Sequence, residues 1–300
     1  MKTAFLIAAH NQPSHLAWMV ERLKCDWAYI FIHIDKKSDI SRFSRLIPET
    51  KRIRFLRNNE RIKVNWCGFS LLKATLKLID FALNHDEYFD RFCFLSGTCF
   101  PIKHNDQMRE YFSTQKEFIR IDRKIELLGS KVHDRFVTRY WFNDCPHFIH
   151  KKFSKKLSRI KLYEKINLYH GCGWWCLTDK SIAFILDFLK KNDDYLKFFK
   201  YVNCPDEIFF QSLMKFSPFA DNITHDFEQH HDIEKYFCTN DHGCHYIDWS
   251  AGGAHPKILD MHDLEYIKQS QALFARKFDE KKSANLLKII EQDILAHDYN

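Results

Sequence analysis

The chain has 300 residues, of which 45% are hydrophobic and 28% are charged. This balance is typical of a soluble globular protein of enzyme size, and it excludes collagen, a coiled coil and an intrinsically disordered chain. The formal net charge of +7 suits an anionic small ligand or a membrane surface and falls short of what nucleic-acid binding requires. Aromatic residues are plentiful, whereas glycine is scarce: its 8 residues are under half of the roughly 7% of average usage.

Short apolar runs of β type alternate with helical patterns in the first half of the chain. They predict strands at Thr3–Ala9, Tyr29–Ile34, Arg52–Leu56 and Arg91–Leu95, and helices at Pro13–Lys24, Asp39–Leu46 and Ser70–Leu83. This alternation implies an α/β fold with a mostly parallel central sheet flanked by helices. Such sheets bind ligands at the carboxyl ends of their strands, where His10, Asp35, Ser96 and Gly97 are expected.

The second half of the chain is less regular. We expect strands near Glu117–Ile121 and Cys244–Trp249 and helices near Ser181–Lys190, Glu207–Lys215 and Asn285–Ala296. Because no repeat or Pro/Gly/Ser linker interrupts the chain, we expect one domain over 1–300, with a nucleotide-binding half (1–125) and an acceptor-binding and catalytic half (126–300). The basic stretch Lys151–Lys165 is most simply a solvated helix face, and the sharper alternative is a membrane-surface helix.

Targeting and metal signals are weak. The apolar run Ala4–Ala9 is short for a secretory signal and no uncharged stretch reaches 18 residues, so we expect a cytoplasmic protein, with peripheral contact to the inner membrane face as an alternative. The 10 cysteines lack C-x-x-C pairs, which predicts reduced thiols. Ordinary histidines, rather than a zinc site, are favoured for the region that contains His225, His230, His231, His242, His245, Cys238 and Cys244.

Two segments carry residues suited to chemistry on sugars. Pro205-Asp206-Glu207 is most simply the first turn of a helix, but a carboxylate held there would also serve as a general base. Gly171–Thr178 contains Trp174 and Trp175, and we expect one of these rings to pack in the core and the other to line a cleft, where it would stack on a sugar.

Two further segments suit an anionic ligand. The run Tyr246–Trp249 leads into a loop of small residues with Gly252 and Gly253, which is either a structural turn or a place where a ligand approaches the backbone. In Leu273–Asp279, Arg276 and Lys277 lie within an apolar frame, which favours partial burial and a role in holding phosphate.

These segments, together with Phe94–Gly97 and Phe100–Ile102, occur in the order seen in glycosyltransferase family 14. The chain resembles this family from Ala4 to about Asp279, and a bacterial-type member is expected. The family includes the core-2/I-branching β-1,6-N-acetylglucosaminyltransferases and the peptide O-xylosyltransferases. The resemblance implies a GT-A-type α/β fold, a UDP-sugar donor and inversion of the anomeric centre.

The resemblance also implies roles for individual residues. Glu207 matches the catalytic base, Asp35 matches the acid that contacts uridine, and Lys277, with Arg276 beside it, matches the lysine that neutralises the diphosphate. Ala9 and His10 match the end of the first strand, and His245 takes the place of an arginine near the nucleotide. The candidates for contacts with donor or acceptor sugar are Ser96, Gly97, Trp174, Trp175 and Asp206.

No metal or other cofactor is expected. The resemblance implies metal independence, and no D-x-D pair follows a mid-chain strand, so fixed cations are the expected partners of the leaving diphosphate. Two positions depart from the family pattern: His245 is only partly charged near neutral pH, and Cys99 stands where relatives often have an acid. The first departure leaves more of the diphosphate stabilisation to Lys277, and the second alters the expected donor or acceptor pocket.

The expected function is therefore transfer of a sugar, with GlcNAc favoured, from a UDP-sugar to a hydroxyl group of a glycan or lipid-linked oligosaccharide. The missing anchor and the basic stretch suggest synthesis of bacterial surface polysaccharide or lipooligosaccharide. One alternative is a UDP-xylose-dependent xylosyltransferase, and another is an inactive carbohydrate-binding protein with the same fold. No nucleic-acid partner is expected.

Overall fold

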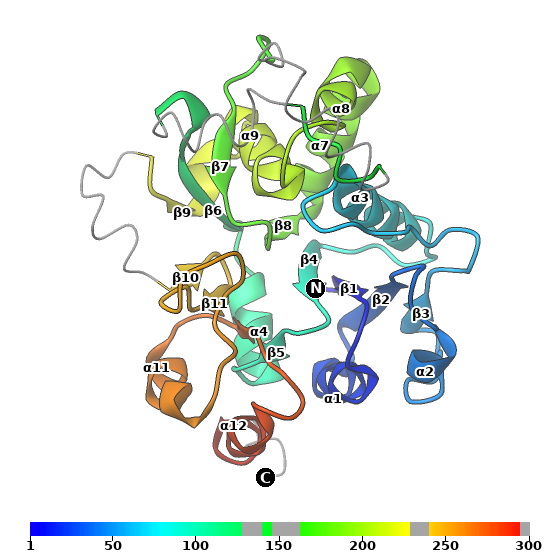
Figure 1. The fold of residues 1–300 in the computed structure, drawn as a ribbon, viewed down its shortest axis with the longest axis vertical. Helices are drawn as coiled ribbons and strands as arrows, with labels where there is room; N and C mark the ends of the chain where they lie inside the picture. Colours follow the sequence, from blue (N-terminus) through cyan, green and yellow to red (C-terminus); the bar gives the residue numbers. More distant parts are fainter. Residues whose placement is uncertain (128–139, 146–162, 229–239, 295–300) are drawn as a thin grey trace.

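A computed structural model describes residues 1–127, 140–145, 163–228 and 240–294. Its first half contains the expected alternation of strands and helices (Figure 1). The elements are β1 (Thr3–Ala9), α1 (Pro13–Leu23), β2 (Ala28–Ile34), α2 (Ser41–Ser44), β3 (Ile53–Phe55), α3 (Phe69–Leu83), β4 (Arg91–Ser96), β5 (Phe100–Pro101) and α4 (Asn105–Phe112).

The second half begins with the longest strand of the molecule among the described residues. Its elements are β6 (Glu117–Lys124), β7 (Tyr169–Gly171), β8 (Cys176–Thr178), α7 (Asp179–Lys191), α8 (Asp193–Phe199), α9 (Phe209–Phe216), β9 (Ile223–Asp226), β10 (Asp241–His242), β11 (His245–Ile247), α11 (Leu264–Gln269), β12 (Phe274–Arg276) and α12 (Ala284–Ile289). Short 3-10 turns lie at Ile125–Leu127, Pro205–Glu207, Ala220–Asn222 and Met261–Asp263, and a π turn spans Ile290–Ile294.

The main sheet has eight strands in the order β3-β2-β1-β4-β8-β6-β7, with β9 paired to β6. Strands β3, β2, β1 and β4 are parallel, whereas β8 runs antiparallel to both β4 and β6. The predicted α/β class with a mostly parallel central sheet is therefore confirmed, and the helices cover both faces of the sheet (Figure 1).

Burial on both faces explains the near-continuous apolar runs of the first strands. In β1, Phe5 and Ile7 pack into one hydrophobic cluster with α1, α4 and α12, and Ala4 and Leu6 pack into the other with α3, α7 and α9. Parallel strands in such sheets lose the alternation of polar and apolar residues that a half-exposed strand shows.

Several element boundaries differ from those predicted. The predicted helix Asp39–Leu46 shrinks to the four residues of α2, and the strand predicted at Cys244–Trp249 is the three-residue β11. Strand β11 belongs to a second, four-stranded sheet of order β10-β11-β12-β5, which local sequence patterns did not indicate. Residues 151–162 of the basic stretch lie outside the described residues. No helix in the described ranges is long and apolar enough to cross a bilayer.

Candidate active site

A cleft of about 2030 Å³ lies at the carboxyl ends of the parallel strands and extends to the second sheet. Backbone hydrogen bonds connect these strand ends. The amide of Asp35 donates to the carbonyl of Ala9 at 2.8 Å, and the amide of Gly97 donates to the carbonyl of Ala8 at 2.9 Å. Nine predicted site residues line the cleft: Ala9, His10, Asp35, Ser96, Trp174, Asp206, Glu207, Arg276 and Lys277. The structure therefore brings together residues that are up to 268 positions apart.

Three predicted site residues do not line the cleft. Trp175 and His245 are fully buried, and Gly97 lies against Ala9, where an added Cβ would approach the Cβ of Ala9 to 2.5 Å. The expectation that one tryptophan packs in the core and the other lines the cleft is correct, because Trp174 lines it. Because the His245 side chain is fully buried and does not line the cleft, its position argues against the predicted contact with the nucleotide.

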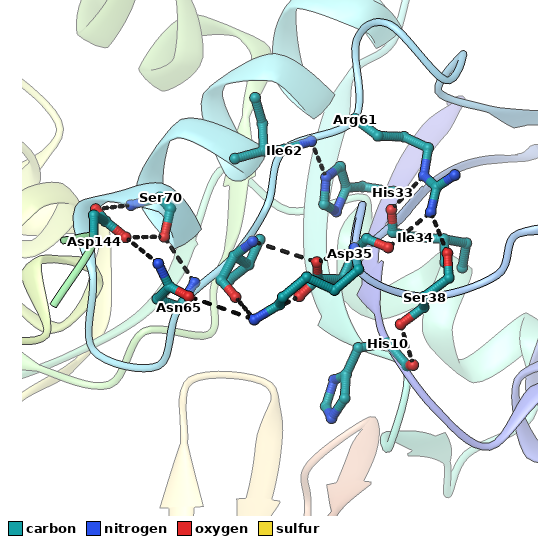
Figure 2. Close-up of polar contacts among 12 residues, drawn as sticks. His10, His33, Ile34, Asp35, Ser38, Arg61, Ile62, Asn65, Ser70 and Asp144 are labelled. Carbon is teal, nitrogen blue, oxygen red and sulfur yellow. Dashed lines mark hydrogen bonds and ion pairs between the residues drawn. The ribbon is translucent and has the colours of Figure 1, made fainter. Parts of the chain in front are cut away.

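Asp35 directly follows β2 and lines the cleft, and Figure 2 shows the polar contacts around its carboxylate. Its Oδ1 accepts hydrogen bonds from the amides of Lys37 at 2.8 Å and Val64 at 3.4 Å, and its Oδ2 lies 3.5 Å from Lys37 Nζ. The residue is only 6% exposed, so these donors hold the carboxylate in one orientation.

Arg61 fixes the backbone around Asp35, as Figure 2 shows. The buried guanidinium donates to the carbonyls of Ile34 at 2.8 Å, Asp35 at 2.7 Å and Ser38 at 2.6 Å. Sequence patterns gave no signal for Arg61, because most of its partners are backbone carbonyls, and the other is the Asn58 side chain, which accepts from Nη1 at 2.8 Å.

His33, in β2, also supports this region. Its ring accepts a hydrogen bond from the amide of Ile62 at 2.9 Å, and burial lowers the pKa of His33 to about 4, so the ring is a neutral acceptor at physiological pH.

A second network anchors the loop that precedes α3 (Figure 2). The Asp144 carboxylate accepts the amide of Ser70 at 2.9 Å, in the first turn of α3, and it also accepts the Asn65 side chain at 3.3 Å. A carboxylate at a helix N-terminus is favoured by the free amides and by the helix dipole. This loop carries Trp66, which is 62% exposed at the cleft and has its ring centre 5.4 Å from that of His255.

Glu207 lies in a 3-10 turn, not in the first turn of an α-helix as predicted. The turn is Pro205–Glu207, and α9 begins two residues later, at Phe209. The amide of Glu207 donates to the carbonyl of Cys204 at 3.0 Å, and Cys204 has a left-handed backbone with φ of 46°. This geometry turns the chain so that the Glu207 side chain, 32% exposed, lines the cleft.

A disulfide bond between Cys67 and Cys204 holds the start of this turn. The amide of Cys204 also donates to the carbonyl of Cys67 at 3.0 Å, so the loop before α3 and the turn that carries Glu207 are joined twice. The prediction that the thiols are all reduced is therefore wrong for this pair. The two cysteines are 137 residues apart, and no local spacing motif indicates their proximity.

Buried Gln211, in the first turn of α9, connects the turn to the tryptophan segment. Its side-chain amide donates to the carbonyl of Cys172 at 2.6 Å and to that of Asp206 at 3.3 Å. Gly173, next to Cys172, leaves space for the carboxylate of Asp206, because a Cβ at position 173 would lie 2.8 Å from Asp206 Oδ2. Burial, and then the charge of Glu207, raise the pKa of Asp206 to about 7.

A basic group lies on the other side of Trp174. The guanidinium of Arg276 lies 4.2 Å from the centre of the Trp174 ring, and its Nε is buried without a hydrogen-bond partner among the residues that the structure describes. Lys277 follows directly after β12 and also lines the cleft. Burial lowers the pKa of His245 to about 3, so this histidine is neutral and supplies no charge here.

The carboxylate of Glu207 has a histidine neighbour that sequence reasoning missed. His170 Nε2 lies 3.5 Å from Glu207 Oε2, and His170 Nδ1 lies 2.8 Å from Asp122 Oδ2. Neither residue belongs to a motif, since His170 and Asp122 meet only because β6 and β7 are paired. The described residues contain no cluster of three or more His, Cys, Asp or Glu side chains arranged to hold a metal ion. His230, His231 and Cys238 lie outside them.

The chain is similar in sequence to known proteins. A sequence profile of the family described as Core-2/I-Branching enzyme matches residues 3–270. A xylosyltransferase of Ciona intestinalis is 24% identical over 285 residues, which cover 90% of this chain and 30% of that protein. Xylosyltransferase 1 of Rattus norvegicus is 23% identical over 303 residues, which cover 93% of this chain and 34% of that protein.

The chain thus spans about a third of the length of these curated relatives. The central sheet and its flanking helices are consistent with the GT-A-like fold that the sequence resemblance implies. Since the family profile covers nearly all of the chain, the protein belongs to the Core-2/I-branching enzyme family.

Proposed function

We propose that the protein is an inverting glycosyltransferase that moves a sugar from a UDP-sugar to a hydroxyl group of a glycan acceptor, with Glu207 as the general base. The observation that carries the proposal is one cleft lined by a partly exposed carboxylate, Glu207, and by two cations, Arg276 and Lys277. This combination suits a reaction in which a hydroxyl loses a proton and a diphosphate leaves.

In the proposed reaction, Glu207 accepts the proton of the acceptor hydroxyl as its oxygen attacks the anomeric carbon. The bond from that carbon to the diphosphate oxygen breaks, and UDP leaves with the bonding electrons. Lys277 and Arg276 stabilise the negative charge that develops on the diphosphate, and Asp35 contacts the uridine. The buried Arg276 Nε, which has no partner among the described residues, supports this role because a ligand oxygen would satisfy it.

The donor is proposed as either UDP-GlcNAc or UDP-xylose. The sequence favours GlcNAc, whereas the curated relatives are named xylosyltransferases, which supports xylose. The acceptor is proposed as a glycan or lipid-linked oligosaccharide of a bacterial surface polymer, and peripheral membrane contact through residues 151–165 stays a prediction.

A donor panel tests the proposal directly. Purified protein is incubated with UDP-GlcNAc, UDP-xylose, UDP-glucose and UDP-galactose, and UDP release and UDP binding are measured with and without EDTA. The proposal expects binding of UDP and turnover of one donor that persists in EDTA. Failure to bind or turn over any of the four donors would refute it, and loss of turnover in EDTA would refute the metal-independent form.

Two variants separate the proposed roles. Glu207→Gln keeps the shape of the side chain but removes the base, so kcat falls by about 10²- to 10⁴-fold while UDP affinity stays near that of the wild type. Lys277→Ala removes a cation from the diphosphate site, so UDP affinity falls. If the wild type binds a UDP-sugar but transfers no sugar in any assay, and Glu207→Gln binds it equally well, the inactive carbohydrate-binding alternative is favoured.

A further inference from the structure

His170 lines the cleft and lies between two carboxylates. Its Nδ1 is 2.8 Å from Asp122 Oδ2, and its Nε2 is 3.5 Å from Glu207 Oε2. A neutral imidazole carries only one N–H and can donate to only one of these oxygens, whereas an imidazolium can donate to both. The geometry therefore favours a charged ring with one N–H directed at each carboxylate.

The far side of this arrangement is fixed by a buried arginine. Arg120 Nε donates to Asp122 Oδ1 at 2.7 Å, and Arg120 Nη1 donates to the carbonyl of Asp241 at 3.1 Å. The guanidinium also lies 5.0 Å from the ring centre of Phe227. Because Arg120 is only 4% exposed and is also held by Asp241 and Phe227, rotation of the Asp122 carboxylate away from His170 would break its hydrogen bond with a guanidinium that cannot follow it.

The backbone places the two partners with little freedom. Strands β6 and β7 pair with Ile121 opposite Gly171 and Arg123 opposite His170, and the register shifts between these pairs, at Asp122. Such bulges redirect a side chain relative to a regular ladder. Gly171 permits a close approach of the strands, because a Cβ there would lie 1.9 Å from the carbonyl oxygen of Arg120. The positions of Asp122 and His170 therefore follow from the sheet.

We propose that His170 is a positioning residue for Glu207: the imidazolium, held by Asp122, keeps the Glu207 carboxylate in one orientation in the cleft. This inference rests on the proposed function of Glu207 as the general base. A base must be deprotonated and must be within hydrogen-bond reach of the hydroxyl that it activates. An adjacent cation favours the ionised form of a carboxyl group.

The charged groups around His170 agree with this role. Burial by itself lowers the pKa of His170, but the hydrogen bonds with Asp122 and Glu207 outweigh burial and raise the pKa to about 10. Burial likewise opposes ionisation of Asp122, yet His170 and Arg120 hold its pKa well below the usual range. Other ionisable groups that face the site include Asp206 beside Glu207 and Arg276 from β12. His242 from β10 is buried, its pKa is well below 6.5, and it accepts a hydrogen bond from Arg120 as a neutral ring.

The pH dependence of turnover tests the inference. In His170→Gln the cation beside the Glu207 carboxylate is lost, so the acidic limb of the kcat profile is expected to move to higher pH by about 1 to 3 pH units. UDP affinity stays near that of the wild type, because His170 is not placed at the diphosphate. His170→Lys restores a cation and is expected to return part of the shift. Superimposable profiles for wild type and His170→Gln would overturn the inference.

A matched control uses His104, a histidine outside the cleft. His104 also pairs with an aspartate, since its Nδ1 lies 3.5 Å from Asp106 Oδ2, but it caps α4 and does not line the cleft. His104→Ala is expected to leave the pH profile of kcat unchanged. That result would show that loss of an arbitrary His–Asp pair does not shift the profile. A shift equal to that of His170→Gln would count against a specific role for His170.

A titration that needs no turnover keeps this inference separate from the proposed function. The His170 imidazole is followed by NMR in the wild type, in Glu207→Gln and in Asp122→Asn, with thermal unfolding to confirm that each variant is folded. The pKa is expected well above 6.5 in the wild type and lower in both variants. An ordinary value in the wild type, near 6.5, would overturn the inference even if transfer is observed. Absence of transfer with a raised pKa would instead overturn the proposed function and leave the pairing intact.

Discussion

The guanidinium of Arg276 lies 4.2 Å from the centre of the Trp174 ring. The same ring stacks on Phe94, with centroids 5.1 Å apart and planes 20° from parallel. Trp174 thus connects a residue of β4 in the main sheet to a cation of β12 in the second sheet. This contact positions Arg276 at the cleft, so we expect the ring to influence binding of the proposed diphosphate ligand through the arginine.

Replacing Trp174 by Leu is expected to weaken UDP binding by about 2- to 30-fold, because a cation–π contact contributes roughly 0.5–2 kcal/mol. Trp174→Phe keeps an aromatic face and is expected to lose less. Isothermal titration with UDP measures both effects. Equal UDP affinities for wild type and Trp174→Leu would show that Arg276 needs no support from the ring.

Gly173 provides the space that the Asp206 carboxylate fills. Because an added Cβ would lie 2.8 Å from Asp206 Oδ2, Gly173→Ala is expected to displace the acid and to destabilise the fold by about 1–3 kcal/mol, as overpacking does. Urea unfolding measures the loss.

A double-mutant cycle identifies the cause of that loss. In an Asp206→Ala background the carboxylate is absent, so the same Gly173→Ala change is expected to cost little. If Gly173→Ala destabilises both backgrounds equally, contact with Asp206 is not the reason for glycine at this position.

Reduction of the disulfide between Cys67 and Cys204 is expected to destabilise the protein. The bridge closes a loop of 137 residues, and loss of such a constraint costs about 4–5 kcal/mol on the chain-entropy account. Urea unfolding with and without a reducing agent measures the difference.

The control for this prediction is the double variant Cys67→Ala, Cys204→Ala. It is expected to match the reduced wild type and to show no response to the reducing agent. A thiol titration of unfolded protein is expected to find two fewer reactive thiols before reduction than after it. Equal thiol counts would show that the bridge does not form.

Buried neutral histidines are expected to make the fold sensitive to acid. Burial lowers the pKa of His245 to about 3 and that of His33 to about 4, whereas the unfolded chain binds these protons near pH 6.5. Between pH 6.5 and 4 the unfolded state therefore takes up protons that the folded state does not, and stability falls as the pH falls. Each such group contributes a slope of about 1.4 kcal/mol per pH unit in this window.

Urea unfolding between pH 4.5 and 8 measures this slope. His245→Phe keeps a ring between Trp174 and Phe274 but removes the titrating group, so the slope is expected to decrease. His262→Ala serves as the control, because the His262 side chain is 92% exposed, and it should leave the slope unchanged. An identical slope for His245→Phe and wild type would show that His245 titrates normally.

The first half of the fold follows closely from the sequence. Strand β1 is observed over the predicted residues Thr3–Ala9, and α1 begins at the predicted Pro13. Both signals are local: an apolar run long enough for a strand buried on two faces, and a proline suited to the first position of a helix. The same local patterns place Asp35 and Ser96 at the strand ends that line the cleft.

The candidate site divides along similar lines. Glu207, Lys277 and Arg276 lie in short motifs that resemble a known family, and each of them lines the cleft. Trp175 lies in the segment Gly171–Thr178 and His245 directly precedes Tyr246–Trp249, segments of the same resemblance, but both side chains face the core, because side chains of neighbouring residues in extended segments point to opposite sides. A motif identifies the segment, and the direction of each side chain depends on what packs against it.

Residues close together in the chain were therefore enough to predict the α/β class, the early strands and helices, and the segments that carry the candidate base and cations. The pairing of β5 with β12, the bridge between Cys67 and Cys204, and the position of His170 between Asp122 and Glu207 became evident only in the folded protein. These contacts join residues that are distant in the chain. They form because burial of the two faces of the sheet fixes which strands are neighbours, and no local pattern records that choice.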